Sequence, residues 1–200
     1  RGFTKFSEKV DPAECFNFLN SYFSKVDPII QRNGGIIYQF LGDGILAMFP
    51  EENGENDDSL PSAHRAMVTV GEFHCFLEEY NLGRQRAGYV PMKVGIGLHC
   101  GLVAIGVTGS SDRYDAAAFG HTINFASRLE GKTKDLDQQV IISEDVYYSI
   151  PDQLKAQCHH LGEHEIRGME DKVMIYGYRS SESCLGQSGP WQDCKPRSAV

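Results

Sequence analysis

Three side chains have types and spacings that suit the binding of a polar or charged ligand. Asp43 stands between Gly42 and Gly44, with apolar runs on both sides of this Gly-Asp-Gly triplet. The pattern predicts a β-hairpin with a carboxylate at its tip. Asn124 and Arg128 are four residues apart in the segment HTINFASRLEG, so both project from one face of a predicted helix. Taken singly, these features also suit an ordinary turn and an ordinary solvated helix face.

A long amphipathic helix is expected ahead of the hairpin. Asp11 can cap this helix, Pro12 suits its first position, and Glu14 completes a capping box. The glycine pair at 34–35 ends it. The apolar face is expected to contain Phe16, Leu19, Tyr22, Phe23, Val26, Ile29 and Ile30.

Further hairpins and helices are expected along the rest of the chain. The strands around Asp43 are predicted near 36–40 and 45–49. Apolar runs on either side of Gly101 predict another strand pair, and the HTINFASRLEG segment a short helix stopped by Gly131. The other predicted elements are a helix over about 60–80, a buried strand at QVIIS, a capped short helix at SEDVYYSI and a closing hairpin in CHHLGEHEIRGMEDKVMIYGYR.

This order of elements predicts an α+β fold, a ferredoxin-like sandwich whose mostly antiparallel sheet is covered by helices. Residues 1–179 are expected to form one domain, of a size that buries roughly 70% of the surface of its unfolded chain. From position 180 the composition turns to Ser, Gly and Pro, so 180–200 is interpreted as a flexible tail.

Composition and charge narrow the class of protein. Hydrophobic residues make up 41% and charged residues 23% of the chain, as in soluble globular proteins, and the formal net charge is -8. This acidity, with no local Lys/Arg cluster, argues against nucleic acid as a partner. No apolar run approaches the ~20 residues that span a bilayer, so we expect no direct membrane contact from this chain and a cytoplasmic location.

The six cysteines show no CxxC pair and no regular spacing. They are interpreted as free thiols in a reducing compartment, with a disulfide framework, a zinc site and a reactive thiol as open alternatives. No histidine is assigned to a metal.

Five motifs follow one another along the chain. They are GFTKFSE, FLGDG, GIGLHCGLVAIGVTGSSDR, NFASRLEG and IRG. Together they resemble the catalytic domain of class III nucleotidyl cyclases, especially the bacterial-type members. The resemblance covers about Gly2 to Tyr178, nearly the whole predicted domain. Each motif is weak alone, and an unrelated ferredoxin-like interaction module would need all five to coincide.

The resemblance implies a two-metal reaction on a nucleoside triphosphate. Two ions can serve the attacking 3′-oxygen and the leaving pyrophosphate together, and hard oxygen ligands favour Mg²⁺ or Mn²⁺. Asp43 matches one of the family's two metal-binding aspartates. The other, in the pattern D-x-x-G-F-T, would lie two residues before Arg1. Two alternatives stay open: the printed chain is truncated at this N-terminal edge, or the parent protein lacks that acid. In either case, the chain as printed is expected to be metal-poor and inactive. The backbone N–H groups of Gly2, Phe3 and Thr4 are expected to cradle the triphosphate.

The resemblance also implies roles for residues in the second half of the chain. Asn124 matches the residue that orients the ribose, and Arg128 the one that stabilises charge on the phosphate under attack. Arg167, in EIRG, matches a basic position for the terminal phosphates, with a plain surface strand cation as the alternative. Because the family shares each site between subunits, we expect a homodimer, or a pairing with a related cyclase domain, across a two-fold interface.

The positions that read the base in this family depart from their usual residues. Gln39 stands where adenylate-forming relatives carry Lys and guanylate-forming relatives Glu, Ala117 occupies the partner position, and His121 replaces an Asp. A Gln amide both donates and accepts, so discrimination between bases should be weak. ATP is the favoured substrate because the surrounding motifs resemble bacterial adenylate cyclases.

Two other functions stay open. One is a guanylate or loosely selective cyclase, and the other is a degenerate, inactive domain that binds nucleotide or a catalytic partner without turnover. For Gln39 itself, a solvent-facing strand residue is the structural alternative.

Overall fold

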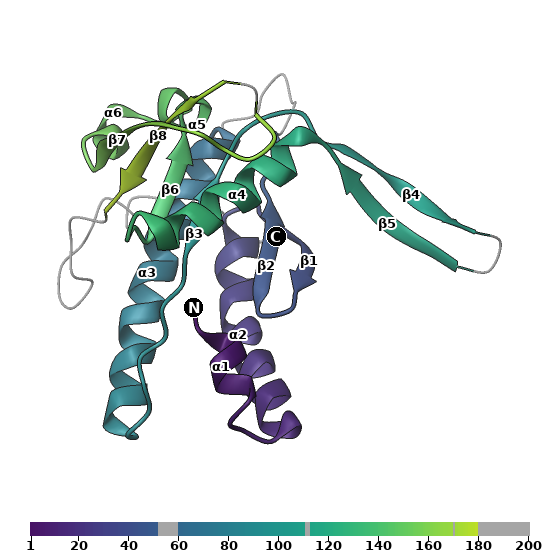
Figure 1. Ribbon diagram of the computed structural model, residues 1–200, viewed down its shortest axis with the longest axis vertical. Helices are drawn as coiled ribbons and strands as arrows, with labels where there is room; N and C mark the ends of the chain where they lie inside the picture. Colours follow the sequence, from purple (N-terminus) through teal and green to yellow (C-terminus); the bar gives the residue numbers. More distant parts are fainter. Residues whose placement is uncertain (52–59, 111–112, 170, 180–200) are drawn as a thin grey trace, which may run out of the picture. The chain divides into compact units, whose positions relative to one another are not determined.

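The computed structural model describes residues 1–51, 60–110, 113–169 and 171–179 of the chain (Figure 1). They belong to two compact units, Arg1–Lys93 and Val94–Arg179. The expectation of a single domain over 1–179 stays a prediction, and the expected tail at 180–200 lies outside the described residues. No helix of the described part is long and apolar enough to cross a membrane.

The first unit consists of three helices and one hairpin. Its elements are α1 (Phe3–Ser7), α2 (Pro12–Arg32), β1 (Ile36–Leu41), β2 (Gly44–Met48) and α3 (Ser62–Arg86). The cap of α2 is confirmed, because the Asp11 carboxylate accepts a hydrogen bond of 2.8 Å from the Ala13 N–H. The positive φ of Gly34, 71°, then turns the chain out of α2 toward β1.

The apolar face of α2 is buried only in its C-terminal half. Tyr22, Val26, Ile29 and Ile30 are buried, as predicted. Phe16 was expected in the same face, but 67% of its surface is exposed. The periodicity identifies the stripe, whereas its buried length depends on how far α3 and the hairpin extend along the helix.

A buried cation holds the base of the β1–β2 hairpin. Arg65 on α3 is 7% exposed, and its guanidinium donates to the carbonyls of Gly34 at 3.0 Å and of Asn33 at 3.3 Å. It also donates to the Pro50 carbonyl, beyond the end of β2. Arg65 therefore fixes both ends of the hairpin to α3, so the strands that carry the Asp43 tip start from a fixed position.

The second unit contains a four-stranded sheet, a separate hairpin and three helices. Its elements are β3 (Ile96–Leu98), β4 (Ala104–Ser110), β5 (Arg113–Phe119), α4 (His121–Asp135), β6 (Val140–Ser143), α5 (Glu144–Ser149), α6 (Asp152–Lys155), β7 (Cys158–His164) and β8 (Val173–Tyr178). The sheet order is β3-β6-β8-β7, with β3 and β6 parallel and the other neighbours antiparallel. Helix α4 packs on β3 and β6, and α5 contacts β6 and β8. The predicted α+β character, with mostly antiparallel strands covered by helices, is confirmed.

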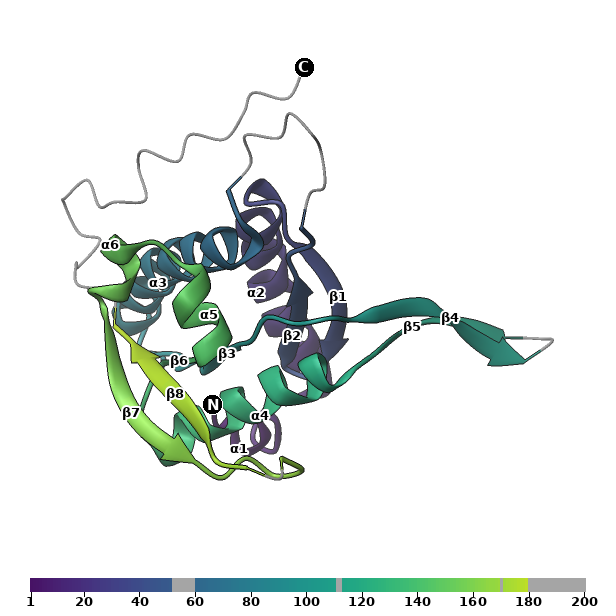
Figure 2. The ribbon, with the colours of Figure 1, turned by 90° about the horizontal axis from the view of Figure 1, so that it is seen from above.

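The β4–β5 hairpin runs away from the sheet of its own unit (Figure 2). Its strands pair from Ala104↔Phe119 to Ser110↔Arg113. The expectation that β3 and β4 form a pair is therefore wrong, because β4 pairs with β5 and β3 with β6. The sequence of β5, RYDAAAF, lacks the β-branched residues that mark a strand, so no strand was predicted there.

Helix α4 was expected to stop at Gly131, and this expectation is wrong, because the helix continues to Asp135. Leu129 and Thr133, on either side of this glycine, are both fully buried. Their packing outweighs the roughly 1 kcal/mol that a glycine costs inside a helix.

The cysteines differ from one another in state. Cys15 and Cys158 are free thiols, and burial raises the pKa of Cys158 to about 11, which makes it unreactive at neutral pH. Cys75, on α3, is disulfide-bonded, which corrects the expectation for this residue.

Candidate active site

The segment Gly2–Thr4 forms the start of a short helix. Gly2 adopts the left-handed conformation, with φ of 82°, and its carbonyl accepts from the Phe6 N–H at 3.2 Å. The N–H groups in the first turn of a helix have no acceptor within that helix. Gly2 and Thr4 are exposed. The backbone donors of this turn are thus available to an anion from solvent.

Asp43 lies at the tip of the β1–β2 hairpin, as predicted. Gly42 takes the positive φ, 64°, that the turn requires, and Leu41 pairs with Gly44 across it. The Asp43 side chain is exposed and forms no hydrogen bond or ion pair recorded within the described part of the chain. Burial raises the pKa of the Tyr22 phenol, and the nearby Asp43 carboxylate raises it further. The tip therefore lies close to α2, with its carboxylate uncommitted.

Gln39 faces away from α2. It pairs with Leu46 of β2, just after a register shift between Ile37 and Gln39. The next side chain, Phe40, lies on the α2 side, where its ring centroid is 4.5 Å from that of Phe23. Because neighbouring side chains of a strand alternate between faces, the exposed Gln39 amide lies on the opposite face.

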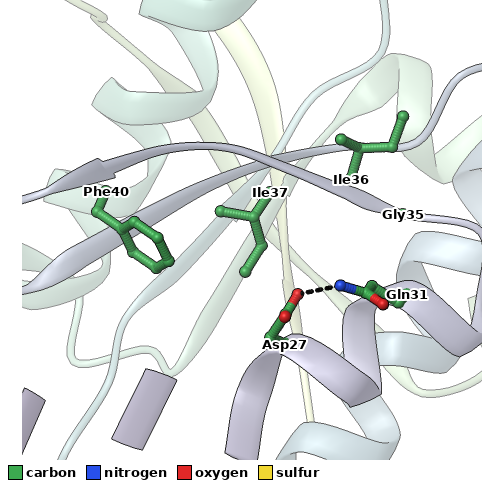
Figure 3. Close-up of a pocket in the computed structure, with 6 residues that line it drawn as sticks. All are labelled: Asp27, Gln31, Gly35, Ile36, Ile37 and Phe40. Atoms are coloured by element: carbon green, nitrogen blue, oxygen red, sulfur yellow. Dashed lines mark hydrogen bonds between the residues drawn. The ribbon is translucent and has the colours of Figure 1, made fainter. Parts of the chain in front are cut away.

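A hollow on the α2 side of β1 is distinct from this face. Figure 3 shows Ile37 and Phe40 pointing toward Asp27 and Gln31 of α2, whose side chains share a hydrogen bond of 2.8 Å. Gly35 and Ile36 complete the lining. No cation lines this hollow, so it offers nothing to a phosphate, and no candidate residue lies in it.

Helix α4 is seated directly on β3. A Cβ atom at Gly97 would lie 2.3 Å from the backbone nitrogen of Glu130 and 2.4 Å from the carbonyl oxygen of Ala126. Only a glycine lets the strand approach the helix backbone this closely. The buried Phe125 and Leu129 fix the rotation of α4.

This rotation determines where Asn124 and Arg128 point. Each directly precedes one of the two buried residues, so the pair occupies a face beside the buried stripe. Asn124 is exposed and Arg128 half-buried. The predicted projection from one face of one helix is confirmed.

Arg128 lies against the turn that contains Arg167. Gly168 has a φ of 76°, and a Cβ atom there would lie 3.0 Å from both terminal nitrogens of the Arg128 guanidinium. Because Gly168 has no side chain, the Arg128 guanidinium can lie directly against its backbone. We call this position the seat of Arg128. Arg167 directly precedes Gly168 in the chain. No ion pair with a carboxylate is recorded for either arginine within the described ranges. A guanidinium group held against this turn suits the binding of a polyphosphate.

A half-buried histidine, His99, contacts the core side chain of α4. The His99 ring lies 4.4 Å from the Phe125 ring, and its Nδ1 is 2.9 Å from the Ser143 hydroxyl and 3.4 Å from an Asp145 carboxylate oxygen. Burial lowers the pKa of His99, Asp145 opposes this change, and His121 adds to it. His121 stacks on Phe125 at 5.8 Å, so the residue that departs from the family pattern packs on the core side chain next to Asn124.

Comparison with known proteins identifies the family. The sequence profile described as "Adenylate and Guanylate cyclase catalytic domain" matches residues 1–179. The chain belongs to this family. An adenylate cyclase of Anabaena cylindrica is 32% identical over 178 residues, which are 88% of this chain and 34% of that relative. The chain thus spans about a third of the length of this cyclase.

Solved cyclase structures share the fold. The adenylyl cyclase CyaB from P. aeruginosa superimposes with a TM-score of 0.76 at 25% identity, covering 93% of this chain and 92% of that one. The guanylyl cyclase Cya2 superimposes with a TM-score of 0.72 at 31% identity, covering 89% and 86%. The expected class III cyclase fold is confirmed, and the similarity extends to both adenylyl and guanylyl cyclases.

The structure brings the candidate residues of this cyclase domain together in two sets. Gln39 and Asp43 share one hairpin in the first unit. In the second unit, Asn124 and Arg128 share one face of α4, and Arg128 lies against the turn that contains Arg167. Ala117 is on β5, half-buried, and pairs with Gly106. The roles inferred for these residues and for Gly2, Phe3 and Thr4 stay predictions.

Sequence reasoning missed Gly168. The motif IRG was noted for its arginine, whereas the glycine determines where Arg128 can lie. A glycine between two strands, directly after a cation, was the available signal, because such a position often needs a positive φ.

The fit of a divalent cation depends on Asp43. An exposed carboxylate on a turn with a fixed base is a suitable oxygen donor for Mg²⁺ or Mn²⁺. No group of three or more His, Cys, Asp or Glu side chains that could hold a metal occurs in the described residues. The residues present therefore fit as one ligand of a metal site that needs further oxygen donors.

Proposed function

We propose that this chain is the catalytic domain of a nucleotidyl cyclase. It converts a purine nucleoside triphosphate, with ATP favoured, to the 3′,5′-cyclic monophosphate and pyrophosphate. The observation that carries the proposal is the seat of Arg128 on Gly168, beside Arg167 and one helical turn from Asn124, in a chain of the cyclase family. The contact with Gly168 locates the Arg128 guanidinium, and neither arginine has an ion pair with a carboxylate recorded among the described residues.

Each residue has a part in the proposed reaction. The 3′-hydroxyl loses its proton to solvent water and its oxygen bonds to the α-phosphorus. The bond between the α-phosphorus and the oxygen that bridges to the β-phosphorus breaks, and pyrophosphate leaves. Asn124 orients the ribose and Arg128 stabilises the charge that develops on the α-phosphate, as preorganised donors do. Arg167 and the N–H groups of Gly2–Thr4 hold the terminal phosphates. Divalent cations bound at Asp43 would polarise the α-phosphate and neutralise the pyrophosphate.

The choice of base rests on Gln39 and Ala117. The exposed Gln39 amide can meet the Watson–Crick edge of either purine in one of its two orientations, and the Ala117 methyl group contributes no hydrogen bond. A site without a committed donor or acceptor discriminates weakly. The Anabaena relative and CyaB, both described as adenylate cyclases, favour ATP, whereas the similarity to Cya2 makes GTP the second candidate.

A second copy, or a related cyclase domain, is proposed as the partner. Apolar side chains are exposed on and beside the β4–β5 hairpin: Leu102 is 95% exposed, Ile105 64%, Val107 75% and Phe119 62%. A row of exposed apolar side chains of this size marks an interface. We further propose that the domain works in the cytoplasm.

The test is to incubate the chain, extended upstream by the residues that precede Arg1 in its parent protein, with Mn²⁺ and each of the four ribonucleoside triphosphates. We expect cyclic AMP as the main product, with measurable cyclic GMP. Arg128→Ala and Asn124→Ala should each lower kcat on the order of 10²–10³-fold, as loss of a preorganised donor does. Lys132→Ala, on the same helix, is the matched control and should keep full activity.

The outcomes separate the candidates. Cyclic GMP as the main product would favour the guanylate cyclase. Nucleotide binding without any cyclic product, in an intact dimer with the upstream residues restored, would favour the degenerate domain. Activity that survives Asp43→Ala would remove the proposed metal role of this residue.

A further inference from the structure

Three aromatic rings surround one cation at the C-terminal end of α3. The guanidinium carbon of Arg84 lies 5.2 Å from the ring centroid of Phe18, 5.4 Å from that of Tyr89 and 6.0 Å from that of Tyr80. Its Nε donates to the Val90 carbonyl at 2.9 Å. No carboxylate pairs with it in the described part of the chain. Arg84 thus joins α2, α3 and the segment after α3 mainly by cation–π contacts.

One of these rings, that of Phe18, also packs against α1. Phe18 stacks on Phe3 at 6.5 Å and lies 5.2 Å from Phe6, and the rings of Phe3 and Phe6 are 6.0 Å apart. Helix α1 is five residues long and has no buried residue. A helix this short does not persist by itself, so its position depends on contacts with its neighbours, and these ring contacts are among them. The platform beneath α1 is Phe18, and Arg84 lies against Phe18.

The segment that follows α3 is fastened to the same region. Asn81 donates to the Met92 carbonyl at 2.9 Å and accepts from the Met92 N–H at 2.7 Å. The Tyr89 N–H donates to the Arg84 carbonyl at 2.8 Å. These bonds fix the backbone of the segment that carries Tyr89, whose ring centroid lies 5.4 Å from the guanidinium carbon of the half-buried Arg84.

We propose that Arg84 is a positioning residue for the Gly2–Phe3–Thr4 segment, acting through Phe18. It fixes the ring on which Phe3 and Phe6 stand, and so the orientation of the backbone N–H groups ahead of them. This inference rests on the proposed function, in which those groups hold the triphosphate of the substrate. Loss of Arg84 should loosen α1 and weaken binding of the polyphosphate part of the ligand, while the cyclic product, which lacks that part, binds as before.

The first experiment measures hydrogen exchange of backbone amides in the full chain, which requires no turnover. In Arg84→Met, the amides of residues 6–9 should exchange about three to ten times faster than in the unchanged chain, the size expected for lost cation–π contacts. Arg84→Lys keeps the charge but loses the planar guanidinium group, so its exchange rates should lie between those of Arg84→Met and those of the unchanged chain. Lys25→Met is the matched control, because Lys25 lines the same hollow as Arg84 and has no ring contact recorded in the described ranges.

The second experiment uses the chain extended upstream of Arg1, with Mn²⁺, and measures how strongly each of the two reaction products inhibits it. Arg84→Met should raise KM and the inhibition constant of pyrophosphate about three- to tenfold, and leave kcat and inhibition by the cyclic nucleotide nearly unchanged. Arg84→Lys should restore part of the loss. A general loss of packing would instead raise the inhibition constants of both products together.

The results separate this inference from the function on which it rests. Unchanged α1 exchange in Arg84→Met would overturn it, as would acceleration spread equally over residues 62–77 of α3. If the chain extended upstream of Arg1, without any substitution, forms no cyclic nucleotide with Mn²⁺, the proposed function fails. The exchange result then still decides whether Arg84 holds α1.

Discussion

Arg128 occupies its place because another residue lacks a side chain. Its guanidinium lies about 3.0 Å from the point where a Cβ atom of Gly168 would stand, and Gly168 has a positive φ of 76°. Orientation of a charged donor to within about 1 Å is what distinguishes a catalytic arginine from a surface one. The glycine is therefore as informative about the site as the arginine.

Gly168→Ala should lower kcat on the order of ten- to a hundredfold, because the new methyl group displaces the guanidinium from its seat. The matched control is Gly162→Ala on β7, where φ is also positive, 92°, and nothing lies within 4 Å of the added carbon. Both variants should lose about 1–2 kcal/mol of unfolding free energy to backbone strain. Steady-state kinetics with urea unfolding of each variant makes the comparison, and equal kcat in the two would contradict the seat.

Sequence alone could predict the pairing of Asn124 with Arg128, since their spacing and the buried Phe125 and Leu129 beside them follow helical periodicity. It could also predict Asp43 at a turn, because Gly-Asp-Gly requires one. It could not predict the contact between Arg128 and Gly168. That contact joins two segments about 40 positions apart, and no local pattern encodes it.

In the second unit, direct contact between backbones determines the positions of helices and strands as much as side-chain packing does. Strand β3 has only three residues, yet it fixes α4 because Gly97 lets it lie directly on the helix backbone. The short apolar run predicted a strand, but its partner was misassigned to β4. Partner choice depends on the helix that covers the sheet, and local sequence carries little information about that.

Gly97→Ala should destabilise the chain by about 1–3 kcal/mol and abolish cyclase activity, because the methyl group would meet backbone atoms that cannot rotate away. Gly106→Ala, in β4, is the control: nothing lies within 4 Å of its added carbon, so stability should change by less than about 0.5 kcal/mol. Chemical denaturation followed by circular dichroism measures both. A Gly97→Ala chain as stable as the Gly106→Ala chain would contradict the close approach of β3 and α4.

At the scale of the whole molecule, three histidines link folding to acidity. Burial lowers the pKa of His64, His74 and His99 below the ordinary value of 6.5. At pH above 6.5 these groups are neutral in the folded and the unfolded chain. Below it the unfolded chain takes up protons first, so the free energy of unfolding falls as the pH drops toward the lowered folded pKa values.

Urea unfolding at a series of pH values between 7.5 and 5.5 should therefore show a falling midpoint. His74→Gln should flatten this dependence, because it removes one of the contributing groups, while His160→Gln, at an exposed position, should leave the slope as it was. A midpoint that rises toward pH 5.5 would mean that the buried rings gain rather than lose affinity for protons in the folded chain.

The overall class of the fold was within reach of the sequence, because helices and strands alternate with clear caps and turns. What pattern could not supply is the extent of each element, as Phe16 and Gly131 show. Burial of Phe16 depends on the length of its neighbours, and continuation through Gly131 depends on the packing of Leu129 and Thr133.

The β4–β5 hairpin has a consequence for how such an enzyme would be governed. All seven residues of β4 are exposed, and a ribbon of two strands holds its form poorly in water. In the proposed dimer, the partner polypeptide would cover this hairpin and keep it ordered. The fraction of dimer, and with it the cyclase activity per molecule, would rise with the concentration of the protein. Gene dosage alone could then set the amount of cyclic nucleotide formed, before any effector is involved.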